Sequence, residues 1–168
     1  MSVITTLFGS AAHSTFRLQS LVELAQNAKL PIDQLRSCWV YWVQSSEALS
    51  SDEQGRLEAL LGDVDLKKKL HADALIVAPR VGTISPWSSK ASDIAHNCGL
   101  SKVLRIERGI AFEFNTQAGL IGTIVGGLLG HTQLTAGQRA DCAALLHDRM
   151  VEQAFDLPFD EQDRKSVV

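Results

Sequence analysis

The strongest constraint on the fold is an order of segments that occurs twice along the 168 residues. In each half a short apolar run suited to a β-strand is followed by a segment of helical spacing, a second strand-like run and a second helix. In the first half these are residues 3–8, 14–28, 38–43 and a helix from Ser51; in the second they are 74–78, 87–98, 103–114 and a helix from Thr135 to about Ala154. The sequence therefore predicts two β-α-β-α units.

Two such units, each too small to be comfortable alone, are expected to pair their sheets into one layer or barrel with helices outside. The predicted fold class is α+β, with two pseudo-repeated β-α-β-α units forming a fused pseudo-dimer. A helix between two strands also suggests a right-handed crossover. The whole chain, 1–168, is expected to be one domain, with halves of about 1–65 and 72–158, a charged hinge at 63–73, and the start of a linker at 159–168.

Two helix starts carry capping signals. Ser51 with Gln54, and Thr135 with Gln138, have the spacing of a capping box, in which a hydroxyl and an amide satisfy backbone N–H groups reciprocally. Pro31 is expected to end the first helix.

Composition and motif content disfavour several classes of function. The net charge is −3, which provides no basic field for nucleic acid or an anionic membrane. The three cysteines lie far apart, and the five histidines have no metal-ligand spacing. Residues 118–130, AGLIGTIVGGLLG, are uncharged but too short to span a bilayer. That segment is expected to be a buried or partner-covered connection, and to be poorly ordered or self-associating in the isolated chain.

The most informative segment is residues 80–90, RVGTISPWSSK, hereafter the 80–90 loop. Ser85 or Ser88 can cap the helix that follows, and free N–H groups at a helix N-terminus attract anions. The candidate site residues are two cations and four hydroxyls: Arg80, Thr83, Ser85, Ser88, Ser89 and Lys90. Two interpretations remain open, a site for an anion or an acidic partner surface, and a capped turn that anchors the helix.

Catalysis by the chain itself has little support. Neither a GxxxxGK[ST] nor a GxGxxG motif is present, so nucleotide binding has no motif. Cys98 is near His96, but two residues apart on a helix they point to different sides. The pair Cys142 and His147 is no better placed. Trp39 and Tyr41 are expected on one strand face and Trp42 on the other, for core packing and a domain interface.

One long run resembles a known family. It reads PRVGTISPWSSKASDIAHNCGL from Pro79 to Leu100. Together with Glu107-Arg108-Gly109 and the stretch LHDRM at 146–150, it closely resembles the N-terminal domain of the large single-chain bacterial phosphoribosylformylglycinamidine synthase. Weaker resemblance extends through Phe16-Arg17 to the N-terminus, and residues 118–130 match least well.

The resemblance implies a role without chemistry of its own. Enzymes of this family use glutamine and ATP to convert formylglycinamide ribonucleotide to formylglycinamidine ribonucleotide in purine biosynthesis. ATP and magnesium act in a synthetase domain, and a glutaminase domain hydrolyses glutamine. This chain is expected to need no cofactor, to be inactive alone, and to help assemble the cytoplasmic complex and its substrate cleft. The alternative is a free-standing oligomeric binding module that recognises an anion or partner through the 80–90 loop.

Overall fold

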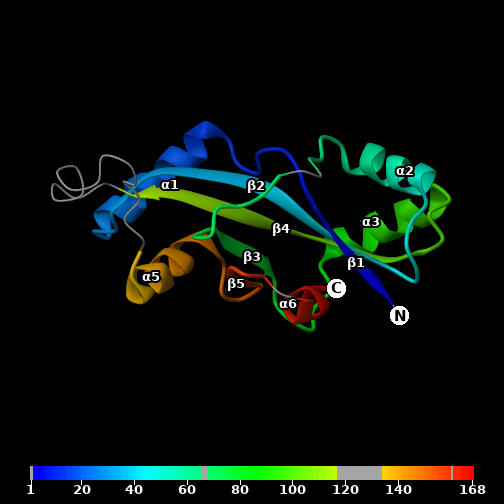
Figure 1. Cartoon of the computed structure of the whole chain (residues 1–168). Helices are drawn as coiled ribbons and strands as arrows, with labels where there is room; N and C mark the ends of the chain where they lie inside the picture. Colours follow the sequence, from blue (N-terminus) through cyan, green and yellow to red (C-terminus); the bar gives the residue numbers. More distant parts are fainter. Residues whose placement is uncertain (1, 66–67, 117–133, 160) are drawn as a thin grey trace.

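The computed structural model describes residues 2–65, 68–116, 134–159 and 161–168. Its framework is one five-stranded antiparallel sheet in the order β1-β2-β4-β3-β5 (Figure 1). The strands are β1 (Val3–Phe8), β2 (Ile32–Ser45), β3 (Leu75–Pro79), β4 (Val103–Thr116) and β5 (Glu152–Asp156). The long central strands pair from Ile32 with Thr116 to Ser45 with Val103.

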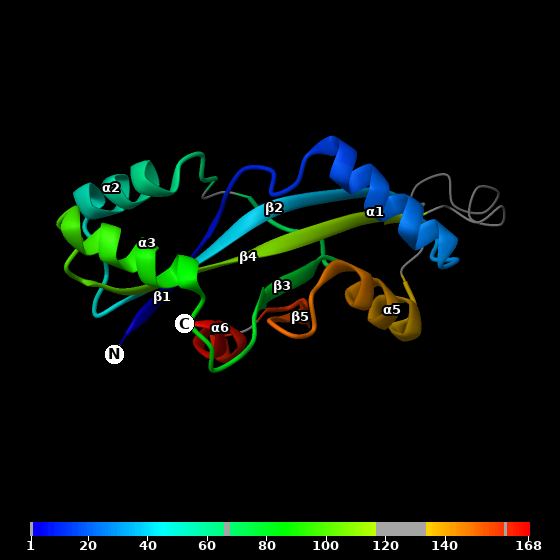
Figure 2. The same cartoon turned by 180° about the vertical axis from the view of Figure 1, so that it is seen from behind.

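Four helices lie on one face of the sheet, in two pairs at its two ends. They are α1 (Thr15–Asn27), α2 (Ser51–Leu61), α3 (Pro86–Asn97) and α5 (Ala136–Leu146), while the short α6 (Glu161–Val167) belongs to the other face. Seen from behind, α1 and α3 lie in front of the strands (Figure 2). Apolar side chains of β2 and β4 pack against α1 and α5 at one end and against α2 and α3 at the other. The α+β class and the sheet with helices outside are thus confirmed.

The internal repeat is visible in matching details. Ser14 caps α1 by accepting from the N–H of Arg17, and Ser85 caps α3 by accepting from the N–H of Ser88. After the C-cap of each helix comes a left-handed residue, Lys29 at φ 61° and Gly99 at φ 81°. The next residues, Leu30 and Leu100, are buried and complete equivalent C-terminal hydrogen bonds. The two halves are therefore built from the same unit.

The capping boxes are partly as predicted. Thr135 and Gln138 form one at the start of α5. The box of α2 lies one residue earlier than predicted, at Ser50 and Glu53 rather than Ser51 and Gln54. Both pairs have the required spacing, but the carboxylate of Glu53 also binds Lys102, which favours this register.

The predicted right-handed crossover is wrong. The strands within each unit, β1 with β2 and β3 with β4, are antiparallel, whereas the crossover rule applies to parallel strands. The pseudo-dimer is completed by the antiparallel pairing of β2 with β4 at its centre. Each unit thus contributes one long strand to the middle of the sheet.

The predicted extension of the last long helix to Ala154 is also wrong. Helix α5 ends at Leu146 because Asp148 makes a turn in which its carboxylate accepts from Met150 and its carbonyl accepts from Val151 and Glu152. The chain then returns as β5 beside β3.

The last residues pack on the domain. The segment that was expected to begin a linker forms α6, and Val167 is 2% exposed against the apolar side chains around Trp42. Residues 118–130 lie outside the described residues. In the described part of the chain no helix is long and apolar enough to cross a membrane.

Candidate functional site

In the 80–90 loop, residues 80–85 connect β3 to α3 and residues 86–90 form the first turns of α3. Backbone hydrogen bonds hold the connection. The N–H of Arg80 donates to the carbonyl of Val151 at 3.1 Å, which joins the loop to the turn before β5. The carbonyl of Arg80 accepts from the N–H of Thr83 at 3.0 Å and from its hydroxyl at 2.6 Å. Gly82, at φ 79°, supplies the left-handed conformation that this turn needs. The loop is therefore a closed turn.

The start of α3 is organised around the carboxylate of Glu107, which the sequence did not identify as a hydrogen-bond partner of the 80–90 loop. Glu107 on β4 has no exposed surface, and its two oxygens accept four hydrogen bonds. Ser85 donates its N–H at 3.2 Å and its hydroxyl at 2.7 Å, while the N–H of Arg108 donates at 3.0 Å and Nη2 of Arg105 at 3.1 Å. The start of α3 already has an anionic partner, 22 residues away in the sequence.

Arg105 and Ser88 complete this network. The hydroxyl of Ser88 is buried and donates to the carbonyl of Ile106 at 2.6 Å. Arg105 donates from Nε to that hydroxyl at 3.4 Å and from Nη2 to the carbonyl of Thr83 at 2.9 Å. Its charge balances that of Glu107, so the buried acid belongs to a neutral, hydrogen-bonded pair.

The structure thus divides the six candidate residues into two groups. Thr83, Ser85 and Ser88 are brought together, and their hydroxyls are used inside the chain. Arg80, Ser89 and Lys90 are exposed and take no part in the Glu107 network. The capped-turn interpretation describes the inner group, and an outward-facing function remains only for the outer one.

A second cation, Arg108, lies beside the network between two tryptophans. Its guanidinium carbon is 4.3 Å from the ring centre of Trp39 and 4.6 Å from that of Trp87, close enough for cation–π attraction on both sides. Burial lowers the pKa of Arg108 from its ordinary value, and Glu107 opposes that change. A shallow cavity of about 230 Å³ is lined by both tryptophans, Arg108 and Glu152. Stacking holds this guanidinium in one orientation.

The two Cys–His combinations are not assembled. The ring of His96 hydrogen-bonds the carbonyl of Val103, and Cys98 is exposed at the C-cap of α3. Burial raises the pKa of Cys142 to about 11, so its thiol is protonated at neutral pH, and His147 bonds the carbonyl of Ala143. Among the described residues no group of three or more His, Cys, Asp or Glu could hold a metal ion.

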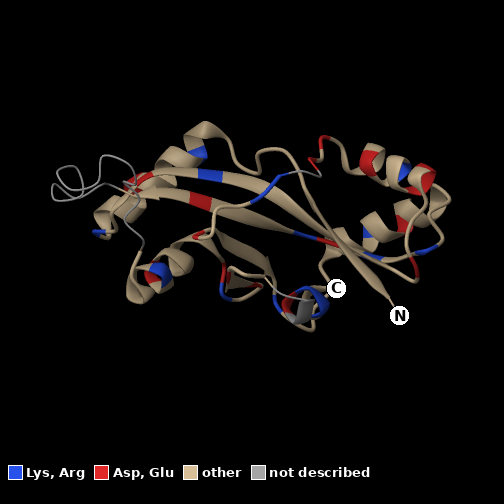
Figure 3. Ribbon diagram, viewed as in Figure 1, with Lys and Arg blue, Asp and Glu red and all other residues tan. Residues whose placement is uncertain are grey.

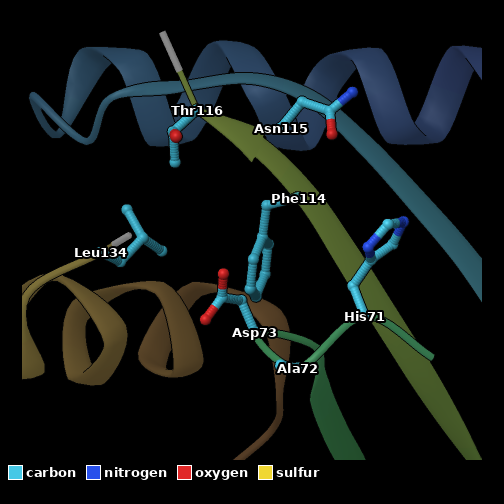
Figure 4. A pocket seen from close by; sticks show the side chains of 7 residues that line it. All are labelled: His71, Ala72, Asp73, Phe114, Asn115, Thr116 and Leu134. Carbon is cyan, nitrogen blue, oxygen red and sulfur yellow. The ribbon is translucent and has the colours of Figure 1, made fainter. Parts of the chain in front are cut away.

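A cavity of about 170 Å³ near the far end of β4 offers no acid–base pair either. His71, Asp73 and Phe114 line it, and Figure 4 shows the ring of Phe114 standing between the other two side chains. The Glu113 carboxylate accepts from the backbone N–H of His71. The cavity lies between the end of β4, residues 71–73 before β3, and Leu134, and no acid–base pair converges on it.

The outer side of the 80–90 loop is apolar as well as basic. Val81 is 49% exposed and Ile84 64% exposed, and Met150 and Val151 in the adjoining turn are 80% and 61% exposed. The bond from Arg80 to Val151 places the two turns side by side. We call these four apolar residues the loop patch. Exposed apolar side chains that adjoin one another are typical of an interaction surface.

Comparison with known proteins gives the family. A family model described as "Formylglycinamide ribonucleotide amidotransferase N-terminal" matches residues 38–163, about three quarters of the chain. The matched region runs from β2 into α6 and includes the 80–90 loop, Glu107 and Arg108. The resemblance seen in the sequence is confirmed, and the chain belongs to the N-terminal domain family of the formylglycinamide ribonucleotide amidotransferases of purine biosynthesis.

Proposed function

We propose that this chain is a non-catalytic domain that helps assemble the glutamine- and ATP-dependent ligase acting on formylglycinamide ribonucleotide, and that it borders the substrate cleft. Its partners are the synthetase and glutaminase domains of the same cytoplasmic enzyme. ATP and magnesium act in the synthetase domain, and this chain contributes no cofactor. Family membership supports the setting.

One observation carries the role in assembly. The 80–90 loop is fixed from inside by Glu107 and Arg105, yet its outer side presents Val81 and Ile84 beside a cation, Arg80. A loop that is already rigid loses little conformational entropy on docking, so exposed apolar side chains there favour association. The loop patch and Arg80 would therefore contact another domain of the ligase.

The test is a charge placed on this surface in the full-length ligase. Ile84→Asp should lower the rate of glutamine-dependent formation of formylglycinamidine ribonucleotide, or raise the KM for the ribonucleotide, and should expose the domain boundary to limited proteolysis. Ile94→Asp is the matched control, because Ile94 is an isoleucine of similar exposure, 53%, on α3 itself. Equal effects of the two substitutions would count against docking through the loop patch.

The second candidate is a free-standing oligomeric module that binds an anion or a partner through the same loop. The exposed cations Arg80 and Lys90 favour it. Against anion binding, the hydroxyl and N–H of Ser85 already bind Glu107. Sedimentation of the chain with and without inorganic phosphate distinguishes the two, because a defined oligomer with phosphate affinity is expected only for the free-standing module. Steady release of glutamate from glutamine by the pure chain would contradict both.

A further inference from the structure

The shallow cavity beside Arg108 lies in the middle of the sheet, on the face that carries the four helices. Side chains from β2, β3, β4, β5 and the start of α3 line it. Arg108 is paired with Tyr41 in the register of β2 and β4, and Tyr41 packs with residues of α2 and α3, so the guanidinium leaves the sheet on its helical side. Figure 3 shows a basic and an acidic band adjoining on β4 between the two helix pairs. A cation therefore stands in the gap that the helices leave.

The guanidinium of Arg108 is stacked between two rings but has no paired anion. Its backbone N–H is one of the four donors that occupy the Glu107 carboxylate. Within the ranges that the structure describes, no carboxylate forms an ion pair with its side chain. Glu152 lines the cavity, but it accepts from the backbone N–H of Asp148 at 2.9 Å. Burial lowers the pKa of Arg108, as expected of a cation that has lost water without gaining an anion.

The other groups that line the cavity restrict the anion that fits. The hydroxyl and N–H of Ser85 already donate to Glu107, so the charge of an incoming anion would be met by a single guanidinium. Glu152 would repel a phosphate, with its double charge, more strongly than a singly charged carboxylate. The two oxygens of a carboxylate also match the planar fork of a guanidinium, which stacking on Trp39 and Trp87 leaves free at its edge. The cavity therefore suits a carboxylate.

The volume of the cavity indicates where that carboxylate comes from. Clefts that enclose a small ligand have about 300–1,000 Å³, whereas this cavity has about 230 Å³ and is shallow. A side chain on a docked domain needs no enclosing cleft, because the surrounding interface excludes water. We propose that Arg108 receives the carboxylate of an aspartate or glutamate from another domain of the ligase, in a bidentate pair formed between Trp39 and Trp87. This inference rests on the proposed function for its partner, but it uses no residue of the loop patch.

A zero-length cross-link tests this pair in the full-length ligase. Arg108→Lys keeps the cation but supplies an amine, which a carbodiimide joins to a carboxylate in contact with it. Mass spectrometry of a digest should then find position 108 linked to an aspartate or glutamate of another domain. Arg17→Lys is the matched control, because Arg17 is an exposed arginine on α1 and its lysine should not link to that acid. The proposal is overturned if position 108 links to no other domain, or only to Glu107 or Glu152.

Modification by phenylglyoxal tests the wild-type arginine without a substitution. Arg108 should react in the isolated chain and at least about tenfold more slowly in the ligase, where a charge-assisted pair occupies its N–H groups. Equal rates, or no reaction in the isolated chain, would overturn the proposal as well. Ile84→Asp scores the loop patch separately. A cross-link from position 108 with no effect of Ile84→Asp retains the Arg108 pair and rejects docking through the loop patch, whereas the opposite result rejects the Arg108 pair alone.

Discussion

Replacing Glu107 with glutamine tests whether the buried network at the start of α3 holds the candidate site together. Four donors share the two carboxylate oxygens of Glu107. Glutamine keeps the shape but turns one oxygen into an NH₂ group, so two donors lose their acceptor and face another donor. If the remaining oxygen accepts from the Ser85 hydroxyl and the Arg108 N–H, then the Ser85 N–H and the Arg105 guanidinium are left without an acceptor.

The magnitude follows from the loss of the ion pair. Removing one partner of a buried pair costs about 3–5 kcal/mol, and each hydrogen bond to a charged group contributes about 1.5–3 kcal/mol. The side chain of Arg105 is 20% exposed, so water can solvate its freed charge in part. We therefore expect Glu107→Gln to lower the free energy of unfolding by about 3 kcal/mol. For a chain of this size that corresponds to a fall in Tm of roughly 6–12 °C.

Urea unfolding followed by tryptophan fluorescence measures this loss, with Glu23→Gln as the matched control. Glu23 is exposed on α1, so its replacement should change stability by no more than about 0.5 kcal/mol. Arg105→Gln combined with Glu107→Gln should cost less than the sum of the single changes, because the unpaired charge is then absent. Equal midpoints for Glu107→Gln and wild type would refute the reasoning.

Three further outcomes are expected. Hydrogen bonding by the Ser50 backbone N–H, with smaller help from Lys102, lowers the pKa of Glu53 to about 2. The wild-type chain should therefore be more stable than Glu53→Gln, fully so above about pH 4.5, and this advantage should vanish as the pH falls toward 2. Unfolding measured across an acid pH series tests this. A thiol reagent at mildly alkaline pH should label exposed Cys98 rapidly and buried Cys142 only on unfolding, as peptide mapping would show. Arg80→Ala should change the stability of the chain by less than about 1 kcal/mol yet impair turnover or ribonucleotide affinity in the full ligase; unfolding of the chain instead would assign Arg80 a structural role.

Much of the fold was accessible from the sequence because its signals are local. Strand and helix periodicities, the caps at Thr135 and the repeated order of segments all depend on residues a few positions apart. The error at the end of α5 has the same origin, since Leu145, Leu146 and Met150 have helical spacing while the side chain of Asp148 ends the helix. Antiparallel pairing within each unit depends on contacts between distant segments, which periodicity does not report.

The candidate site was predictable as a segment but not as an arrangement. The hydroxyls and the Ser85 cap could be recognised in the 80–90 loop, but their partner is a carboxylate on β4. Alternation along β4 cannot show that Glu107 faces the start of α3, because that depends on where β3 ends and how the chain returns. Arg108 likewise becomes notable only when the fold places Trp39 and Trp87 on either side of it.

The repeat itself shows where the two halves have diverged. Counting from the first residues of β2 and β4, Arg36 occupies the position of Glu107, and it is exposed. Counting from the caps Ser14 and Ser85, Phe16 takes the place of Trp87 and is 80% exposed, with no arginine stacked on it. A unit that only had to fold could keep the same residues in both halves. The buried acid, its partner Arg105 and the stacked Trp87 occur in the second half alone, so they are better explained by a demand on the loop before α3 than by a requirement of the fold.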